Sequence, residues 1–563
     1  MNLSNLRKKV ETYNIYIFLF ILVCAGFFGI RSLLHPGFYT SHDGEHQILR
    51  EIYFDDAIKD GQYPPRWAQG NILNGYGYPL FIFSYHAPWF FGEPFMLLGR
   101  SATESVKSVF IVTYILSAIV MFLWIRTIWG NRAGFISALV YIVAPYRFEV
   151  ILVRGALGEA TSFLFVPLVF WSITEIIKNK KTRFISIGAI GLAGLILSHA
   201  MIVYMFLLPI FFFVTVEFFL KKLNKTIVIS TISMVLLGVG LASYYLLPAM
   251  LEKNLTQFDS ALQLHYKDYF VAFWQLLYSK WGYGFDFPGT QNDAMSFQVG
   301  ITQWLLVLFA LISIAIFIVK RKTTAIIKKN VFYAGTFLVI YIFSIIMMLS
   351  ISTDIWNVAV KLFAIDFPWR FLAIATFSSA VLAGFVTYIF PYKKLFICGI
   401  ILLLFVNNRN YMRVNQYTYM SDTEYRKITN TTNQFDEYLP KWANQRIYSS
   451  MKYTEIVSDA KTSIRISKNT SNNLIANLIS SGNAHIRINR IYYPGWKLIV
   501  DGEKKDFEYE STGLPQFTLG KGNHALSYHF SDTPWRLFAN SVSIFACIIT
   551  LSLFVVSKRK KEN

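Results

Sequence analysis

Residues 14–47 read NIYIFLFILVCAGFFGIRSLLHPGFYTSHDGEHQ, so a hydrophobic segment long enough to cross a bilayer runs directly into a cluster of ionisable side chains. This cluster holds four titratable groups within five positions: His42, Asp43, Glu45 and His46. Charged side chains are costly in hydrocarbon, so the cluster must lie at a membrane surface or in a water-filled cavity. We therefore expect the chemistry of this chain to take place just beyond its first hydrophobic span.

The rest of the composition indicates a mainly α-helical polytopic membrane protein. The chain has 563 residues, of which 54% are hydrophobic and 17% aromatic, and this is too apolar for a soluble protein of this size. The segment after the basic start Arg7 to Lys9 has no small-residue cleavage motif, so we expect an uncleaved first helix. About twelve segments are predicted to span the membrane: 14–34, 105–126, 133–150, 159–177, 184–200, 201–220, 226–250, 300–319, 331–351, 370–390, 393–407 and 535–557.

The basic residues indicate how these spans are oriented. The net charge of +20 lies mostly in short clusters between apolar runs, which is typical of cytoplasmic loops and does not indicate a nucleic-acid partner. The segment 78–99 is also apolar, but it contains Pro79, Pro88, Glu93 and Pro94. If this segment crossed the membrane, every basic cluster between 126 and 394 would move to the side opposite the basic N-terminus. We therefore predict that 78–99 lies on or re-enters the outer surface, with both termini cytoplasmic.

Three regions follow from this topology. Residues 1–407 are predicted to form the membrane domain with a long outer loop at 35–104, and 534–563 a final span with a basic tail. Residues 408–533 are predicted to form an extracytoplasmic domain that is β-rich, and β-sandwich-like, in its second half. Polar and apolar residues alternate there, and Asp501-Gly502 is typical of a hairpin turn. Cys24, Cys398 and Cys547 all fall in apolar segments, which indicates neither a disulfide framework nor a thiolate metal site.

Asp43 is the strongest candidate for catalysis. A carboxylate next to the bilayer, flanked by His42, Glu45 and His46, can act as a general base toward a hydroxyl or help to hold a divalent cation. The alternative is that Asp43 only caps a surface helix over 45–59, since Asp is a favoured N-cap residue.

Further polar residues are predicted on the same side of the membrane. Arg154 and Glu159 suit an anionic substrate group or a second base, but they can equally pair with each other. His199 ends a span, where a lone histidine is more often structural than functional. Arg370 opens another span and can bind a lipid phosphate, or it can anchor the helix together with Trp369.

Other motifs narrow the class of protein. The aromatic and glycine-rich segments 76–79 and 281–286 suit either stacking on sugar rings or packing of loops onto the bilayer. The sequence has no phosphate-binding glycine-rich loop, zinc motif or serine nucleophile elbow, which argues against a nucleotide-driven pump.

Several motifs together resemble a known family. They are His42-Asp43-Gly44, the stretch 75–79, Ala144 to Arg147 with Arg154 to Glu159, Leu197 to His199, Pro368 to Phe371, and the stretch 492–497 with 500–502. In this order they resemble GT-C fold glycosyltransferases, and more closely the bacterial YfhO-like and 6-pyruvoyl-tetrahydropterin-synthase-related membrane protein families.

The resemblance implies transfer of a sugar from a polyprenyl-phosphate carrier to an extracytoplasmic acceptor, with inversion. The acceptor would be an envelope glycopolymer, a glycolipid or a protein, and the chain would lie in a bacterial plasma membrane with its active face outside. In that scheme Asp43 is the base and Arg370 neutralises the departing phosphate. The remaining substrate-binding residues would be His42, Glu45, His46, Arg154, Glu159 and His199.

The same resemblance leaves a metal requirement open, because Asp43 lacks an adjacent second aspartate and Glu45 lies two residues on. The first alternative function is a transporter or flippase of lipid-linked sugars. That function needs polar groups along a path through the bilayer, yet 301–319 and 334–350 carry no charged residue. A scaffold that recruits partners through the β-rich domain is a further alternative, but it does not explain the charged residues around Asp43.

Overall fold

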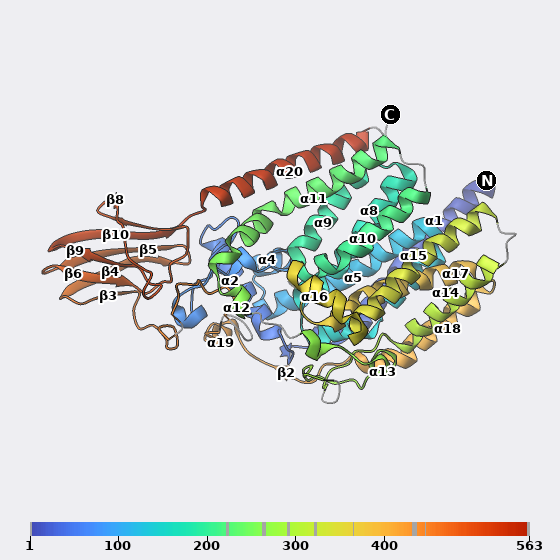
Figure 1. Cartoon of the computed structure of the whole chain (residues 1–563), viewed down its shortest axis with the longest axis horizontal. Helices are drawn as coiled ribbons and strands as arrows, with labels where there is room; N and C mark the ends of the chain where they lie inside the picture. The colour runs from blue at the N-terminus through green and yellow to red at the C-terminus, as the bar shows by residue number, and fades with distance from the viewer. Residues whose placement is uncertain are drawn as a thin grey trace.

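The chain folds into a bundle of long helices with a β domain projecting from one end, and both termini lie at the other end (Figure 1). In this computed structural model we describe residues 3–220, 224–261, 266–289, 293–319, 324–363, 365–430, 436–444 and 446–559. The predicted architecture, a mainly helical membrane protein with a β-rich region near the C-terminus, is confirmed.

Eight helices in the described part of the chain are long and apolar enough to cross a membrane, or nine if one bent pair counts as a single span. The eight are α5 (Ala102–Trp129), α8 (Leu157–Asn179), α10 (Ala200–Leu220), α11 (Lys225–Glu252), α14 (Ile301–Val319), α15 (Ala325–Met348), α17 (Leu372–Ile389) and α20 (Pro534–Arg559).

The predicted number of twelve spans is therefore not confirmed. Helix α1 (Leu3–Gly29) has a shorter apolar part at Ile15–Gly29. Helices α9 (Arg183–Ser198) and α18 (Lys393–Asn408) have 16 residues each. At about 1.5 Å per residue such a helix is shorter than a hydrocarbon core of about 30 Å.

The bent pair occupies the predicted span 133–150. Its first part is helix α6 (Asn131–Ile142), and its second part is α7 (Pro145–Phe148), which continues into a π-helix at Glu149–Val153. The second part is bent by 51° relative to α6. Proline has no backbone N–H and disfavours helical geometry in the residue before it, and Ala144 is accordingly extended. The break brings the turn that holds Arg154 to the outer end of the bundle.

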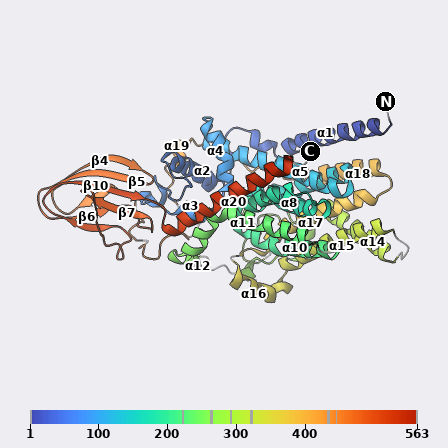
Figure 2. The ribbon, with the colours of Figure 1, turned by 90° about the horizontal axis from the view of Figure 1, so that it is seen from above.

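The long loop after α1 forms an outer layer of short helices. These are α2 (Gly44–Lys59), α3 (Leu80–Phe83) and α4 (Ala87–Leu97), and Figure 2 shows α2 and α4 at the end of the bundle that bears the β domain. Residues 78–99 thus form two helices, each too short to cross a bilayer. Strand β1 (Phe38–Tyr39) pairs antiparallel with β2 (Tyr417–Thr418) and fastens this loop to the chain after α18. Shorter helices elsewhere are α12 (Phe258–Ala261), α13 (Phe273–Leu277), α16 (Thr353–Leu362) and α19 (Asp422–Tyr425).

The β domain consists of two antiparallel sheets whose inner faces form a common core. The five-stranded sheet has the order β4-β5-β10-β7-β8 and the three-stranded sheet β3-β6-β9. Residues of β5, β6, β7 and β10 alternate between buried and more exposed, as in a sandwich. The strands are β3 (Ile456–Ser458), β4 (Thr462–Thr470), β5 (Asn473–Ser480), β6 (Ala484–Ile488), β7 (Trp496–Val500), β8 (Glu503–Lys504), β9 (Gln516–Leu519) and β10 (Gly522–Phe530).

The hairpin predicted at Asp501-Gly502 joins β7 to β8. Val500 pairs with Glu503, and both turn residues have positive φ, +54° at Asp501 and +88° at Gly502. A two-residue turn of this kind matches the twist of the flanking strands. The second strand of the hairpin is the short segment Glu503–Lys504.

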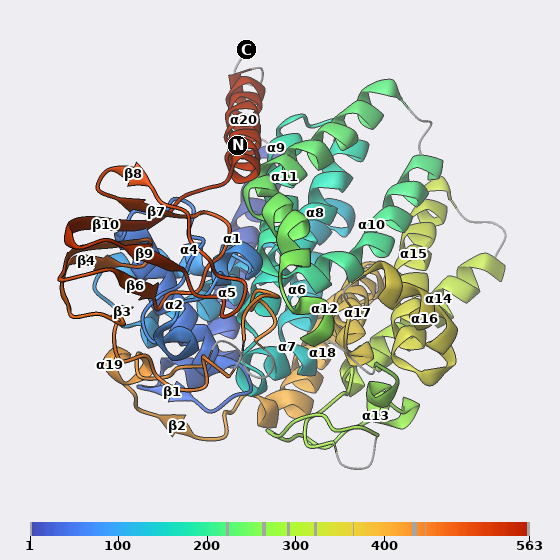
Figure 3. The same cartoon turned by 60° about the vertical axis from the view of Figure 1, so that its left-hand side comes forward.

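A group of buried polar contacts joins the β domain to the bundle. Arg536, near the start of α20, forms a two-point ion pair with Glu252 at the end of α11, with distances of 2.8 and 2.6 Å. Arg66 of the outer loop contacts Asp532 at 3.3 Å and Asn540 at 2.9 Å. Helix α20 packs along α11, as Figure 3 shows. These contacts fix the base of the β domain against the outer ends of two spans.

The predicted orientation can be checked by cysteine labelling. In a chain whose three natural cysteines are replaced by alanine, Lys180→Cys and Ser450→Cys each place one thiol at an exposed position. We expect a membrane-impermeant maleimide to label position 450 in intact cells and position 180 only after the cells are opened. Labelling of both positions from the same side would contradict the topology, and the cysteine-free chain is the control.

Candidate functional site

Glu159 is the centre of a buried ion cluster at the end of the bundle that bears the β domain. It lies in the first turn of α8 and is 0% exposed. Its Oε2 accepts hydrogen bonds from Arg154 Nη1 at 2.8 Å and from Arg370 Nη1 at 3.1 Å, and its Oε1 accepts one from the Tyr146 hydroxyl. The helix N-terminus also favours a negative charge at this place. One carboxylate therefore joins three separate segments of the chain.

The two arginines are held by further contacts. The Arg154 guanidinium lies over the Trp369 ring, 4.7 Å from its centroid, and the Trp369 indole donates to Asp286 at 2.8 Å. Arg370 Nε lies 2.8 Å from a carboxylate oxygen of Asp366. Arginine has five N–H donors, and these contacts use only some of them. Both guanidinium groups are thus positioned while keeping donors for another anionic group.

The loop that carries Asp43 is hydrogen-bonded to the turn that carries Arg154. The His42 amide donates to Val153 O at 3.2 Å, and the Asp43 amide donates to Arg154 O at 2.8 Å. Gly155 permits this approach, because its φ is +64° and a Cβ there would lie 2.7 Å from Ser41 Oγ. The structure therefore brings the two sequence clusters into direct contact.

Asp43 occupies the N-cap position of α2, but its side chain makes no capping hydrogen bond. Its backbone carbonyl accepts from the Gln47 amide at 3.1 Å, and its carboxylate interacts electrostatically with Arg50 and Arg154. The alternative that the carboxylate serves only to cap the helix is thus not what the structure shows.

The surroundings of the two histidines next to Asp43 favour their neutral form. Burial lowers the pKa of His42, and the Arg154 charge lowers it further. Burial also lowers the pKa of His46, to about 4, and Arg50 adds to the effect. The His42 ring stacks on Phe285 with the centroids 4.2 Å apart. A neutral imidazole offers one donor and one acceptor, so these side chains suit hydrogen bonds to hydroxyl groups.

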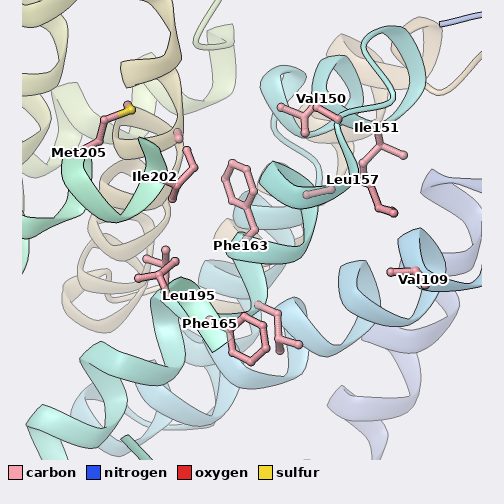
Figure 4. Close-up of a cluster of buried hydrophobic side chains, with 14 of the residues drawn as sticks. Val109, Val150, Ile151, Leu157, Phe163, Phe165, Leu195, Ile202 and Met205 are labelled. Atoms are coloured by element: carbon pink, nitrogen blue, oxygen red, sulfur yellow. The ribbon is translucent and has the colours of Figure 1, made fainter. Parts of the chain in front are cut away.

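His199 joins the cluster from the loop between α9 and α10. It interacts electrostatically with Arg370, Glu159 and Arg154, and its ring centroid is 6.0 Å from that of Tyr85. Beneath the cluster lies an apolar core, and Figure 4 shows side chains of α8, α9 and α10 that belong to it. This core gives the charged groups a rigid base.

The structure thus brings together His42, Asp43, His46, Arg154, Glu159, His199 and Arg370, but not Glu45. Glu45 is exposed, and it interacts electrostatically with Tyr425. No group of three or more His, Cys, Asp or Glu side chains among the described residues is arranged to hold a metal ion. Arg154 and Glu159 do pair with each other, which was the alternative interpretation of their spacing.

Sequence reasoning missed several members of the site. Arg50 lies two turns after Asp43, on the same face of α2 as His46 and Gln47. This helical spacing could have indicated from the sequence that Arg50 belongs to the site. Tyr146 and Asp286 lie in segments that the sequence analysis names, but no spacing along the chain predicted their contacts, and the same holds for Asp366.

The sequence matches one family model and one curated relative. Residues 83–414, more than half of the chain, match the model described as a 6-pyruvoyl-tetrahydropterin synthase related domain of a membrane protein. An uncharacterised protein of Lactococcus lactis subsp. cremoris (strain MG1363) is 24% identical over 294 residues, covering 49% of this chain and 46% of that protein. The chain therefore spans less than half of the length of that relative.

Two solved structures are partly similar. One is the archaeal oligosaccharyltransferase AglB from Archaeoglobus fulgidus, in complex with an inhibitory peptide and a dolichol-phosphate, with a TM-score of 0.38 and 12% identity over 70% of this chain and 55% of that chain. The other is the arabinofuranosyltransferase AftD from Mycobacteria, with a TM-score of 0.41 and 12% identity over 71% of this chain and 26% of that chain. Both TM-scores lie below 0.5.

The role of Glu159 as a shared anchor can be tested by Glu159→Gln. The change leaves two buried guanidinium groups without their common anion, and breaking a buried ion pair costs about 3–5 kcal/mol. We expect a clearly lower melting temperature for the purified protein. Glu104→Gln, at a half-exposed acid that pairs with Lys107 at 2.8 Å, is the matched control for loss of an ion pair near the protein surface. Equal melting temperatures for the two variants would contradict the anchoring role.

Proposed function

We propose that this chain, which belongs to the family of 6-pyruvoyl-tetrahydropterin synthase related membrane proteins, is a glycosyltransferase that uses a lipid-linked donor. The donor is a sugar on polyprenyl phosphate, and the acceptor is an extracytoplasmic hydroxyl group of an envelope glycopolymer, glycolipid or protein. The observation that carries the proposal is the contact between the Asp43 loop and the Arg154–Glu159–Arg370 cluster. It supports the proposal because the proposed base and two cations then lie together at the end of the bundle that bears the β domain.

The reaction is a single in-line displacement. The acceptor hydroxyl oxygen forms a bond to the anomeric carbon while the bond from that carbon to the phosphate oxygen breaks. The hydroxyl proton passes to the Asp43 carboxylate, and polyprenyl phosphate leaves with the electron pair of the broken bond. Attack from the face opposite the phosphate inverts the anomeric centre. Asp43 thus acts as a general base.

The departing phosphate makes the larger electrostatic demand, because its charge increases next to hydrocarbon. Preorganised cations in a water-poor site stabilise such charge without reorganising during the reaction. Arg370 and Arg154 are 9% and 4% exposed and are already fixed by Glu159. We assign Arg370 to the phosphate, and Glu159 to positioning both arginines. His42, His46 and His199 line the site as hydrogen-bonding groups for the two substrates.

The role of Asp43 can be tested by Asp43→Asn in the purified chain. The asparagine keeps the size of the side chain but cannot accept the proton, so we expect transfer from a radiolabelled polyprenyl-phosphate sugar to fall about 10²–10⁴-fold. Donor binding is expected to change little. Glu104→Gln serves as the control for loss of an acid at the outer end. Transfer at the parental rate in the asparagine variant would remove Asp43 as the base.

The role of Arg370 can be tested by Arg370→Lys. Lysine keeps the charge but cannot reproduce the guanidinium contacts to Glu159, Asp366 and a phosphate at once. Because a hydrogen bond to a charged group is worth about 1.5–3 kcal/mol, we expect the Kd for polyprenyl phosphate to rise about 10-fold to 100-fold. Arg409→Lys, at an exposed position after α18, is the matched control. An unchanged Kd would exclude Arg370 from the phosphate site.

A further inference from the structure

Partly exposed aromatic side chains lead from the candidate site to the β domain. We name them the aromatic track, and its members are Phe83, Tyr85, Tyr438, Trp442, Tyr492, Phe507 and Tyr509. They come from four segments of the chain that are far apart in sequence. None of them has a role in the reaction described above, so their arrangement needs a separate explanation.

The track begins beside the candidate site. The Tyr85 hydroxyl donates to Gln47 Oε1 at 3.1 Å, and Gln47 lies one turn of α2 beyond Asp43. Tyr438 interacts electrostatically with both Arg50 and Tyr85. The Tyr438 ring stacks on Phe83 with the centroids 5.2 Å apart. The first three rings of the track therefore adjoin the face of α2 that carries the proposed base.

In the middle of the track, a buried tyrosine connects two of its rings. Tyr493 is 0% exposed, and its ring centroid is 6.3 Å from Phe83 on one side and 6.3 Å from Trp442 on the other. The segment that carries Tyr438 and Trp442 is fixed by its backbone, since the Tyr438 amide donates to the Tyr78 hydroxyl at 2.7 Å. The track thus continues from the bundle onto the β domain.

The far end is a compact group of rings on the β domain. The Tyr509 centroid is 4.1 Å from Tyr492 and 5.7 Å from Trp442, and Phe507 is 5.3 Å from Tyr492. The Trp442 indole donates to Tyr492 O at 3.0 Å, which fixes the orientation of the largest ring. Phe507 and Tyr509 are partly buried, whereas Glu508 and Glu510 between and after them are exposed.

This composition fits a carbohydrate better than a lipid or an apolar helix. The track consists of flat rings without aliphatic side chains, and four of the rings carry phenolic hydroxyls. Aromatic faces pack against the C–H groups of sugar rings, and tyrosine and tryptophan combine an apolar face with a polar edge.

We propose that the aromatic track binds an extended glycan, whose reactive end lies at Asp43 and whose remaining sugars lie along the track toward Trp442 and Tyr509. The inference rests on the proposed function and narrows its acceptor to a glycan of several sugars. It follows that affinity for the acceptor increases with its length until the track is filled.

Binding can be measured apart from catalysis in the full-length Asp43→Asn chain. The probes are fluorescently labelled oligosaccharides of two, four and eight sugars, prepared from the envelope polysaccharide of the native host. We expect the eight-sugar probe to bind most tightly. Tyr509→Leu and Phe507→Leu, which keep apolar bulk but remove the flat face, are each expected to weaken its binding about 5-fold or more. The two-sugar probe is expected to be little affected by either change.

The control is Tyr453→Leu, because Tyr453 is a 98% exposed tyrosine of the same region outside the track. Melting temperatures show whether each variant is folded. Equal affinity for all three probe lengths, or undiminished binding in both folded track variants, would overturn the proposal. So would binding of unglycosylated envelope peptides in place of the oligosaccharides. Sugar transfer at the parental rate by the Asp43→Asn chain, with length-dependent binding intact, would instead refute the proposed reaction and leave the glycan-binding track standing.

Discussion

The shared carboxylate of Glu159 is the interaction on which the rest of the site depends. Two buried guanidinium groups lie next to each other at the end of the bundle that bears the β domain, and without an anion between them they would repel each other in a medium of low dielectric. Glu159 neutralises part of this charge and also joins α8 to the turn before it and to the start of α17. A site built in this way is already ordered before any substrate arrives.

Backbone geometry makes that interaction possible. The break at Pro145 ends one helix and lets the chain turn, so that Tyr146 and Arg154 approach the first turn of α8. Because residue 155 is a glycine, no side chain there prevents the Asp43 loop from approaching. One proline and one glycine therefore allow the Asp43 loop and Arg154 to come into contact, whereas the long spans hold these segments in place.

The sequence predicts much of this arrangement, but not all of it. The basic clusters predict that Asp43, Arg154, Glu159 and Arg370 lie on one side of the membrane, and the structure places these residues at one end of the bundle. Helical periodicity explains both errors on α2: Arg50 lies on the face of Asp43, whereas Glu45 is turned away from it by about 200°. The number of spans was predicted less well, because hydropathy does not register the bend at Pro145 or the short length of α9 and α18. Contacts between distant segments, such as Trp369 with Asp286, have no local pattern at all.

A binding surface on the β domain can serve a reaction at α2 only if the two parts keep a fixed distance. The polar group at their junction supplies this constraint, since Arg536 binds Glu252 of α11 while Arg66 of the outer loop binds Asp532 and Asn540. Arg66 and Arg536 are 2% and 0% exposed, so these contacts are protected from competing water. Arg66 also belongs to the same outer loop as α2, and Tyr493 beside Arg536 supports the middle of the aromatic track. The junction therefore holds the loop of the proposed base Asp43, the bundle and the β domain in fixed relative positions. The proposed long acceptor, bound at one end and modified at the other, requires such a fixed arrangement.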